Sequence, residues 1–130
     1  MAGTFKFELV TPERMVLSQD ASQVIVPGVE GEFTVLPGHA PVISALRPGV
    51  VDATLGDARN IRVFVKGGFA EIDADRVTVL AERALDVEAM DTAIISRELQ
   101  TAEADLAAAT GDAEKLAAAS AVEQLKALQR

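Results

Sequence analysis

The composition of this chain changes abruptly near residue 85, and this change limits its possible folds more than any other feature. All five Phe, all five Pro and eight of the nine Gly lie before it. Residues 85–130 are instead rich in Ala, Glu and Leu, with Gly111 as their one glycine. Aromatic and β-branched residues favour strands, whereas Ala, Glu and Leu favour helices. The sequence therefore predicts a β domain over residues 1–84 followed by an α-helical domain over residues 85–130.

Short apolar runs separated by turn residues fill the first domain. In the first run, Phe5, Phe7 and Leu9 occupy every second position, the pattern of a half-buried strand. Further runs predict strands at 23–26, 33–36, 41–46, 50–55, 60–65, 69–72 and 76–80, and residues 73–75 predict a hairpin turn. Strands that recur roughly every 8–12 residues are typical of a sandwich or barrel. Because no long helical stretch separates them, we expect no parallel βαβ sheet.

The second domain predicts two helices joined by a short turn, which should pack antiparallel. Asp86 is placed to cap the first helix, with Leu85 and Met90 at the two positions of a hydrophobic staple. Gly111 is placed to end this helix in a left-handed cap, and Asp112 to cap the second helix. Apolar stripes at helical spacing run through 95, 99, 102, 106 and 109, and through 118, 122 and 125. Because Ala side chains bury little area, we expect a weakly held, mobile appendage.

Composition removes several classes of function. The chain has no Cys and one His, which excludes disulfides and thiolate or multi-histidine metal sites. A net charge of −8 argues against nucleic acid or anionic lipid as direct partners, since both bind basic surfaces. No serine lies in a Gly-x-Ser-x-Gly motif, so we expect no hydrolase. No apolar run approaches the roughly 20 residues that span a bilayer, so we expect no membrane insertion. The N-terminus also lacks the pattern of a signal peptide.

Residues 27–41 form the segment with the strongest local pattern. Three prolines and three glycines within it predict a rigid, specifically shaped loop, and such loops often carry recognition. The alternative is purely structural: Pro and Gly make turns there, and His39 caps one of them. Spacing alone leaves both interpretations open.

Four segments of the chain resemble the epsilon subunit of the F-type ATP synthase. They are residues 27–41, with the pattern Pro-Gly-x-Glu-Gly-Glu-Phe-x-x-Leu-Pro-Gly-His-Ala-Pro, and residues 7–14, 66–71 and 77–82. The resemblance implies a flattened antiparallel β-sandwich of about ten strands, followed by an antiparallel two-helix hairpin. It also implies a rotor subunit of the central stalk, which performs no bond chemistry and couples proton-driven rotation to ATP synthesis.

The resemblance further implies partners and their sites. One side of the sandwich would bind the gamma subunit through apolar surface, and its lower edge would rest on the c-ring of the membrane sector. By position, Glu32 and His39 fall in loops that face the c-ring in this family. The hairpin would be able to reach the alpha and beta subunits. The expected location is peripheral, on the cytoplasmic face of a bacterial inner membrane.

Two departures from the family pattern concern regulation. Family members that bind ATP carry Ile/Leu-Asp-x-x-Arg-Ala at the start of the first C-terminal helix. Leu85 and Asp86 match, but Ala89 replaces the Arg and Met90 replaces the Ala. Since the bidentate phosphate donor is lost, we expect no ATP binding and no cofactor. Residues 85–130 also carry a net charge of −5, whereas a helix that grips acidic catalytic subunits should be basic, so we expect at most weak inhibition of hydrolysis.

A second class of function is compatible with the same residues. The chain would then be a free β-sandwich ligand-binding module with a helical tail. Dependence on a partner separates the two, because a rotor subunit should bind gamma stoichiometrically and bind no metabolite.

Overall fold

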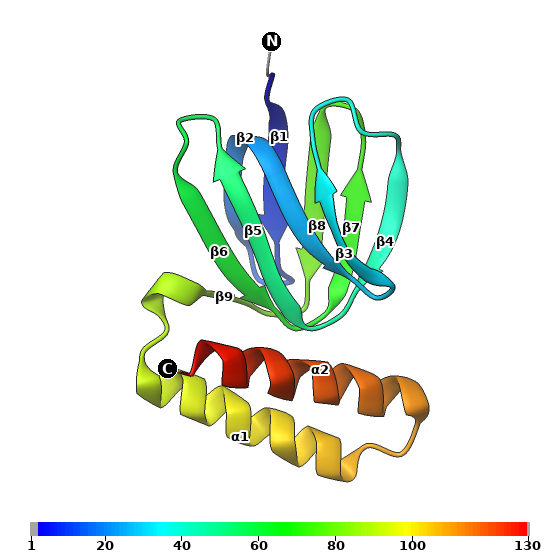
Figure 1. Ribbon diagram of the computed structural model, residues 1–130, viewed down its shortest axis with the longest axis vertical. Coiled ribbons are helices and arrows are strands. Elements are labelled where there is room, and N and C mark those ends of the chain that lie inside the picture. Colours follow the sequence, from blue (N-terminus) through cyan, green and yellow to red (C-terminus); the bar gives the residue numbers. More distant parts are fainter. Residues whose placement is uncertain (1–2, 130) are drawn as a thin grey trace.

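Nine strands and two α-helices make up residues 3–129, the part of the chain that the computed structural model describes (Figure 1). The strands are β1 (Phe5–Val10), β2 (Met15–Gly28), β3 (Gly31–Val35), β4 (Val42–Leu46), β5 (Gly49–Leu55), β6 (Asn60–Val65), β7 (Gly68–Ile72), β8 (Arg76–Ala81) and β9 (Ala84–Asp86). A 3₁₀ turn, η1 (Val87–Ala89), leads into α1 (Thr92–Ala108) and α2 (Asp112–Leu128). The predicted β-sandwich followed by two helices is confirmed.

The long strand β2 joins the two layers of the sandwich. Its first half pairs with β1, and its second half pairs with β5 and β3. The register shifts between Ala21 and Gln23, where the strand bends from one layer into the other. The sequence predicted only residues 23–26 of this strand. It missed the first half because Ser18, Gln19 and Asp20 are polar, and this half becomes a strand through pairing with β1.

The strand order is β1-β8-β7-β4-β2-β5-β6-β9, and all pairings but one are antiparallel. The exception is the parallel pair of β1 and β8, which lie near the two ends of the sandwich domain in the sequence. The absence of a βαβ unit was predicted correctly, but this single parallel pair was not foreseen. It needs no crossover helix, because the whole intervening sandwich serves as the connection. The hairpin turn predicted at Asp73–Asp75 is confirmed: the Asp73 N–H donates to the Arg76 carbonyl at 2.8 Å.

Alternate side chains of the strands point into one continuous core. The largest fully buried side chains there include Phe7, Leu9, Leu55, Val24, Val26, Val35, Val51, Val65, Val77 and Val79. Burying each such side chain contributes about 1.5–3 kcal/mol, so the sandwich core carries most of the stability of the chain.

The helices lie antiparallel beneath the end of the sandwich where β6 runs into β7 and β8 into β9 (Figure 1). They pack on a second cluster centred on Phe64, which is 0% exposed. Phe64 lies on the outer face of β6, paired with Val50 of β5 and Leu85 of β9. Leu99, Ala102, Ala121 and Leu125 cover this row from the helices. One aromatic side chain of the sheet therefore forms the centre of the hairpin's binding site.

The caps of α1 differ from those predicted. Leu85 and Asp86 belong to β9, so their backbone is extended and the helix cannot start there. Asp86 instead caps the 3₁₀ turn, accepting from the Glu88 N–H at 3.0 Å. The N-cap of α1 is Asp91, whose carboxylate accepts from the Ile94 N–H at 2.9 Å. The staple positions accordingly move to Met90 and Ile95.

The turn between the helices also differs from the prediction. Gly111 has φ −94° and is the N-cap of α2, not a left-handed cap of α1. Asp112 is the first residue of α2, so it lies inside the helix and is not its N-cap. The chain leaves α1 through extended backbone at Ala109, with ψ 137°, so no left-handed residue is required.

We expect Phe64→Ala to loosen the hairpin more than the sandwich. Replacing a fully buried Phe with Ala lowers the free energy of unfolding by about 3–5 kcal/mol when the surrounding side chains cannot close the cavity. Undocking of the hairpin would expose this cavity to water and reduce that loss. The helical circular-dichroism signal should then melt at a lower temperature, while the amides of β7 and β8 keep their protection from hydrogen exchange. Leu116→Ala on the outside of α2, where the side chain is 70% exposed, is the control and should change neither. Loss of sheet protection in Phe64→Ala would contradict this division.

The β5–β6 turn contains a strained residue. Ala58 has φ 73°, in the left-handed region that costs a residue with a Cβ about 1–2 kcal/mol. The pKa of the neighbouring Asp57 carboxyl is lowered, because it accepts hydrogen bonds from the Arg59 backbone N–H and guanidinium, which fix the turn. Ala58→Gly should therefore raise the free energy of unfolding by about 0.5–1 kcal/mol, measured by urea denaturation. Ala74→Gly in the β7–β8 turn is the matched control and should lower it; equal effects would show that Ala58 stores no strain.

Candidate partner-binding surfaces

Glu32 and His39, the residues predicted to face a partner, lie on β3 and on the loop that follows it. Glu32 is exposed and pairs in register with Pro27 of β2. His39 is half-buried, and its Nδ1 lies 2.7 Å from the Ala40 carbonyl oxygen. The Gly38 N–H donates to the Ala74 carbonyl at 2.8 Å, which ties this loop to the β7–β8 turn. The loop is thus held in one shape, as its prolines and glycines predicted.

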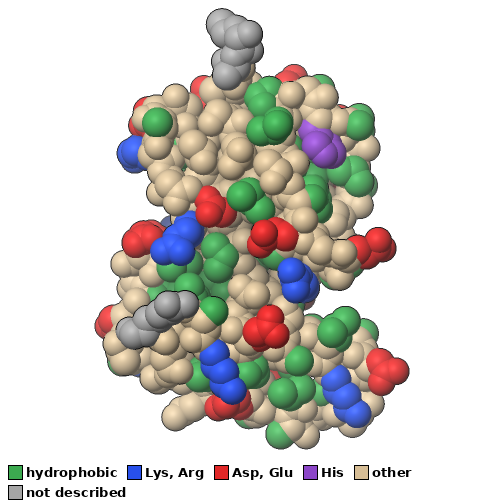
Figure 2. All heavy atoms as spheres, viewed as in Figure 1, with side chains coloured by type: hydrophobic (Ala, Val, Ile, Leu, Met, Phe, Trp, Pro, Cys, Tyr) green, Lys and Arg blue, Asp and Glu red, His purple; other side chains and the backbone are tan. Residues whose placement is uncertain are grey.

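The structure does not bring the Glu32 and His39 side chains together. The His39 ring lies against Phe33, with ring centroids 6.4 Å apart. Because side chains alternate along a strand, Glu32 and Phe33 project from opposite faces of β3. Figure 2 shows the one histidine of the chain at the surface, beside hydrophobic side chains. The two residues can therefore touch one large partner, but they cannot act as a single acid–base pair.

A second surface was not resolved from the sequence. On the outer face of the sheet, paired strand positions place five side chains in one line across β4, β7, β8, β1 and β2, which we name the apolar row: Ala45, Phe69, Leu80, Val10 and Met15. Phe69 is 54% exposed and Leu80 is 44% exposed. Outward positions of a solvated sheet are normally polar, so Phe69 and Leu80 were the signal that could have revealed this face.

A groove follows part of the apolar row. Its lining includes Thr11 and Pro12, which follow β1, and Phe69 and Leu80, which face outward from β7 and β8. Ile43 of β4, which is 69% exposed, lies two residues before Ala45 on the same face of the sheet and is paired with Glu71 of β7. Contiguous exposed apolar surfaces are typical of sites where other macromolecules bind, so this face is a candidate partner-binding surface.

The segment that resembles a degenerate ATP motif has structural roles in this chain. Leu85 packs in the cluster around Phe64, and Asp86 caps η1. Ala89 and Met90 end η1 and lead into α1. The prediction that this motif binds no ATP remains a prediction.

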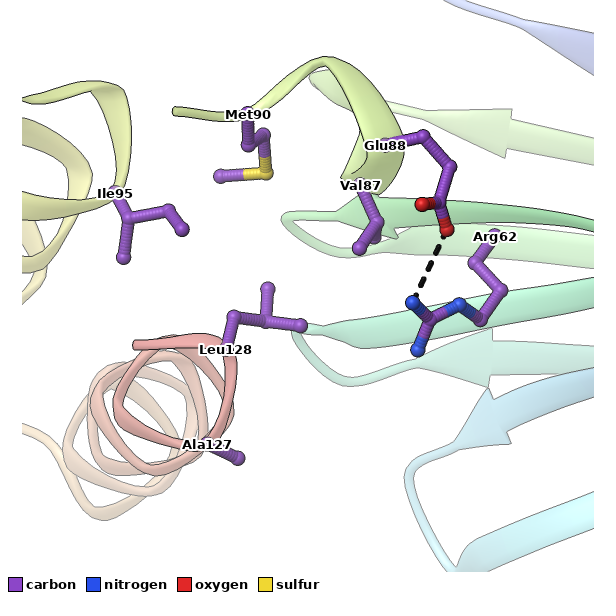
Figure 3. Close-up of a pocket in the computed structure, with 7 residues that line it drawn as sticks. All are labelled: Arg62, Val87, Glu88, Met90, Ile95, Ala127 and Leu128. Atoms are coloured by element: carbon purple, nitrogen blue, oxygen red, sulfur yellow. Dashed lines mark hydrogen bonds and ion pairs between the residues drawn. The ribbon is translucent and has the colours of Figure 1, made fainter. Parts of the chain in front are cut away.

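A hollow lies next to the motif, and Figure 3 shows its walls. Met90, Ile95 and Leu128 supply its apolar side. Among the described residues that line it, Arg62 is the one cation. It donates to Glu88 at 3.1 Å, so the guanidinium already holds a carboxylate. A phosphate group that bound Arg62 would compete with Glu88 for the guanidinium.

Residues 3–129 contain neither a metal-binding cluster nor a membrane-spanning helix. No group of three or more His, Asp or Glu side chains in this part of the chain is placed to hold a metal ion. Neither of its helices is long and apolar enough to cross a membrane. What the described surfaces offer chemically is shape, apolar area and a few charges.

Comparison with known proteins identifies the family. The sequence profile described as the β-sandwich domain of the ATP synthase delta/epsilon chain matches residues 4–87. The ATP synthase epsilon chain of Rhodospirillum rubrum is 46% identical over 121 residues, which are 93% of this chain and 90% of that protein. That of Maricaulis maris is 43% identical over 129 residues, or 99% and 96% of the two chains. The chain belongs to the ATP synthase delta/epsilon chain family, and the family predicted from its motifs is confirmed.

Solved structures agree with this assignment at the level of the fold. A chain of the Euglena gracilis mitochondrial ATP synthase, in an assembly of OSCP, F1 and c-ring, matches with a TM-score of 0.75 at 21% identity. The match covers 97% of this chain and 79% of that one. A chain of the Tetrahymena thermophila mitochondrial ATP synthase, from the central stalk and c-ring, matches with a TM-score of 0.70 at 14% identity and covers 98% of both chains.

The apolar row should be dispensable for stability. Val79 and Leu80 are neighbours on β8, but Val79 points into the core and Leu80 points outward. We expect Leu80→Ala to change the free energy of unfolding by no more than about 0.5 kcal/mol. The matched Val79→Ala should lower it by about 2 kcal/mol or more, because it opens a cavity. Urea denaturation measures both, and a large loss in Leu80→Ala would mean that the row supports the fold.

Proposed function

We propose that this chain is a non-catalytic rotor subunit of an F-type ATP synthase, located in its central stalk. It binds the gamma subunit through the apolar row and contacts the c-ring through the loops that carry Glu32 and His39. The exposed apolar row on an otherwise well-packed sheet supports this role best, since such a surface needs a partner to cover it. Membership in the delta/epsilon chain family names the complex in which that partner is found.

The sandwich is suited to transmit torque. One strand, β2, joins both layers, and β1 pairs with both β2 and β8, so the layers cannot slide apart without breaking many hydrogen bonds. A contact that carries torque needs an interface of at least about 1,000 Å². The apolar row crosses five strands, so a partner along it would be held by the rigid sheet and not by loops.

The c-ring contact orients the subunit more than it anchors it. Glu32 is exposed, and an exposed ion pair to a basic group contributes about 0–1 kcal/mol. His39 sits in the loop fixed by the Gly38–Ala74 hydrogen bond, so it adds a surface of defined shape. In this proposal the chain is a peripheral protein on the cytoplasmic face of a bacterial inner membrane.

The helical hairpin has a secondary role in this proposal. In the structure it packs on the sandwich around Phe64. With four basic and nine acidic residues over 85–130, it is poorly suited to grip an acidic surface of the alpha and beta subunits. We therefore expect at most weak inhibition of ATP hydrolysis through this hairpin.

The test is binding to a purified catalytic complex that contains gamma but lacks its own epsilon subunit. The full chain should be retained on a sizing column at one copy per complex, with little change in ATP hydrolysis. Phe69→Asp places a charge in the middle of the apolar row and should weaken binding at least tenfold. Thr34→Asp, an exposed position on β3, is the matched control and should bind as the unmodified chain does.

The other outcomes are equally informative. If Phe69→Asp binds with full affinity, the gamma contact lies elsewhere on the sandwich. Strong loss of hydrolysis on binding would give the hairpin a regulatory role. No retention of the unmodified chain would favour a free ligand-binding module.

A further inference from the structure

A buried carboxylate connects the hairpin to the sandwich. In the described part of the chain, Glu98 of α1 is the one charged residue that is buried, at 7% exposed. Its Oε2 accepts from the Arg83 guanidinium at 2.8 Å, and its Oε1 lies 3.8 Å from the Lys66 ammonium. A carboxylate leaves water at a high cost unless cations compensate it, and here two of them do.

The sheet itself brings the two cations together. Lys66 follows β6 and Arg83 follows β8, and the Lys66 N–H donates to the Arg83 carbonyl at 3.1 Å. Two like charges on adjacent backbone segments repel each other, and an anion placed between them removes that repulsion. The sandwich therefore presents a preformed pair of cations, and the hairpin supplies the anion that fits it.

The apolar part of the same contact is smaller than the core of the sandwich. Of the four fully or nearly buried hairpin side chains around Phe64, two are alanines, Ala102 and Ala121. Each buries little area, so polar contacts weigh more here than in the sandwich core. Besides the Glu98 cluster, Ser120 of α2 donates to the Pro48 carbonyl at 2.8 Å.

We propose that Glu98, Lys66 and Arg83 form an ionic latch that keeps the hairpin docked on the sandwich. The latch sets the equilibrium between docked and undocked hairpin, and the packing around Phe64 sets its geometry. The side chain of Glu98 is 10% exposed, that of Lys66 22% and that of Arg83 56%. The buried member is thus the one on the moving element, and it returns to water when the hairpin leaves. This inference concerns the chain by itself and does not depend on the rotor role.

Amide hydrogen exchange of the full chain tests the latch, because it detects openings too rare to see directly. Glu98→Gln keeps the shape of the side chain but removes its charge. We expect the amides of α1 and α2 to exchange about tenfold faster in this variant, a change of about 1.4 kcal/mol in docking. The amides of β7 and β8 should keep their rates, which shows that the sandwich remains folded.

Three comparisons make the result specific. Glu103→Gln removes an exposed carboxylate from the same helix and should exchange like the unmodified chain. Arg83→Gln should also speed amide exchange in the helices. In the double variant the exchange rate should rise by less than the product of the two single increases, because the pair acts as one unit. Raising the salt concentration should speed helix exchange in the unmodified chain but not in Glu98→Gln, because salt screens the partly exposed pair.

The opposite result would overturn the latch. A buried charge cluster can cost more in desolvation than it returns, and then Glu98→Gln would slow exchange of the helices. Exchange at an unchanged or lower rate, or a double variant whose effects simply multiply, would mean that the packing around Phe64 alone holds the hairpin.

Discussion

The bend in β2 is the constraint on which the rest of this structure depends. This strand pairs with β1 along its first half and with β5 and β3 along its second half. It therefore fixes the position of one layer relative to the other. The inner faces of the layers then meet in a core of Val, Leu and Phe. The outer faces of the two layers lie outside this core, and they differ from each other. On the layer of β5, β6 and β9, Phe64 receives the chain's own helices; on the layer of β4, β7, β8 and β1, Phe69 receives nothing within residues 3–129.

This difference between the two outer faces explains how a small acidic chain can act as a rotor subunit. Torque requires a rigid body and a partner surface that does not deform, and the apolar row lies on hydrogen-bonded strands that supply both. The hairpin is attached by a narrower contact, with one aromatic residue at its centre and the Glu98 cluster at its edge. The chain thus combines a well-packed core, an exposed apolar face and a hairpin attached through a smaller apolar cluster.

The local sequence pattern correctly predicted the features that depend on residues close together in the chain. Alternation revealed β1, the Asp73–Asp75 turn followed from its spacing, and the composition change gave the order of sandwich and helices. The misses at β2 and at the start of α1 share a cause, which is pairing between distant segments. Residues 15–22 become strand only because β1 lies beside them, and Asp86 fails to start a helix because β6 holds it extended. Glu32 and His39 were predicted as partner-facing residues through motif resemblance, and this stays a prediction. The apolar row and the Glu98 cluster appear only when strands are placed in register.

The central claim is that the outer face of β4, β7, β8 and β1 is covered by a partner in the assembled complex. Hydroxyl-radical footprinting tests it directly, since Phe and Met side chains are oxidised only where solvent reaches them. The chain by itself should be oxidised at Phe69 and Met15, which are 54% and 53% exposed. On binding to a gamma-containing catalytic complex, both should become protected, while Asp57 at the far turn keeps its solvent exposure. Continued oxidation of Phe69 and Met15 in a complex that retains the chain would contradict the account.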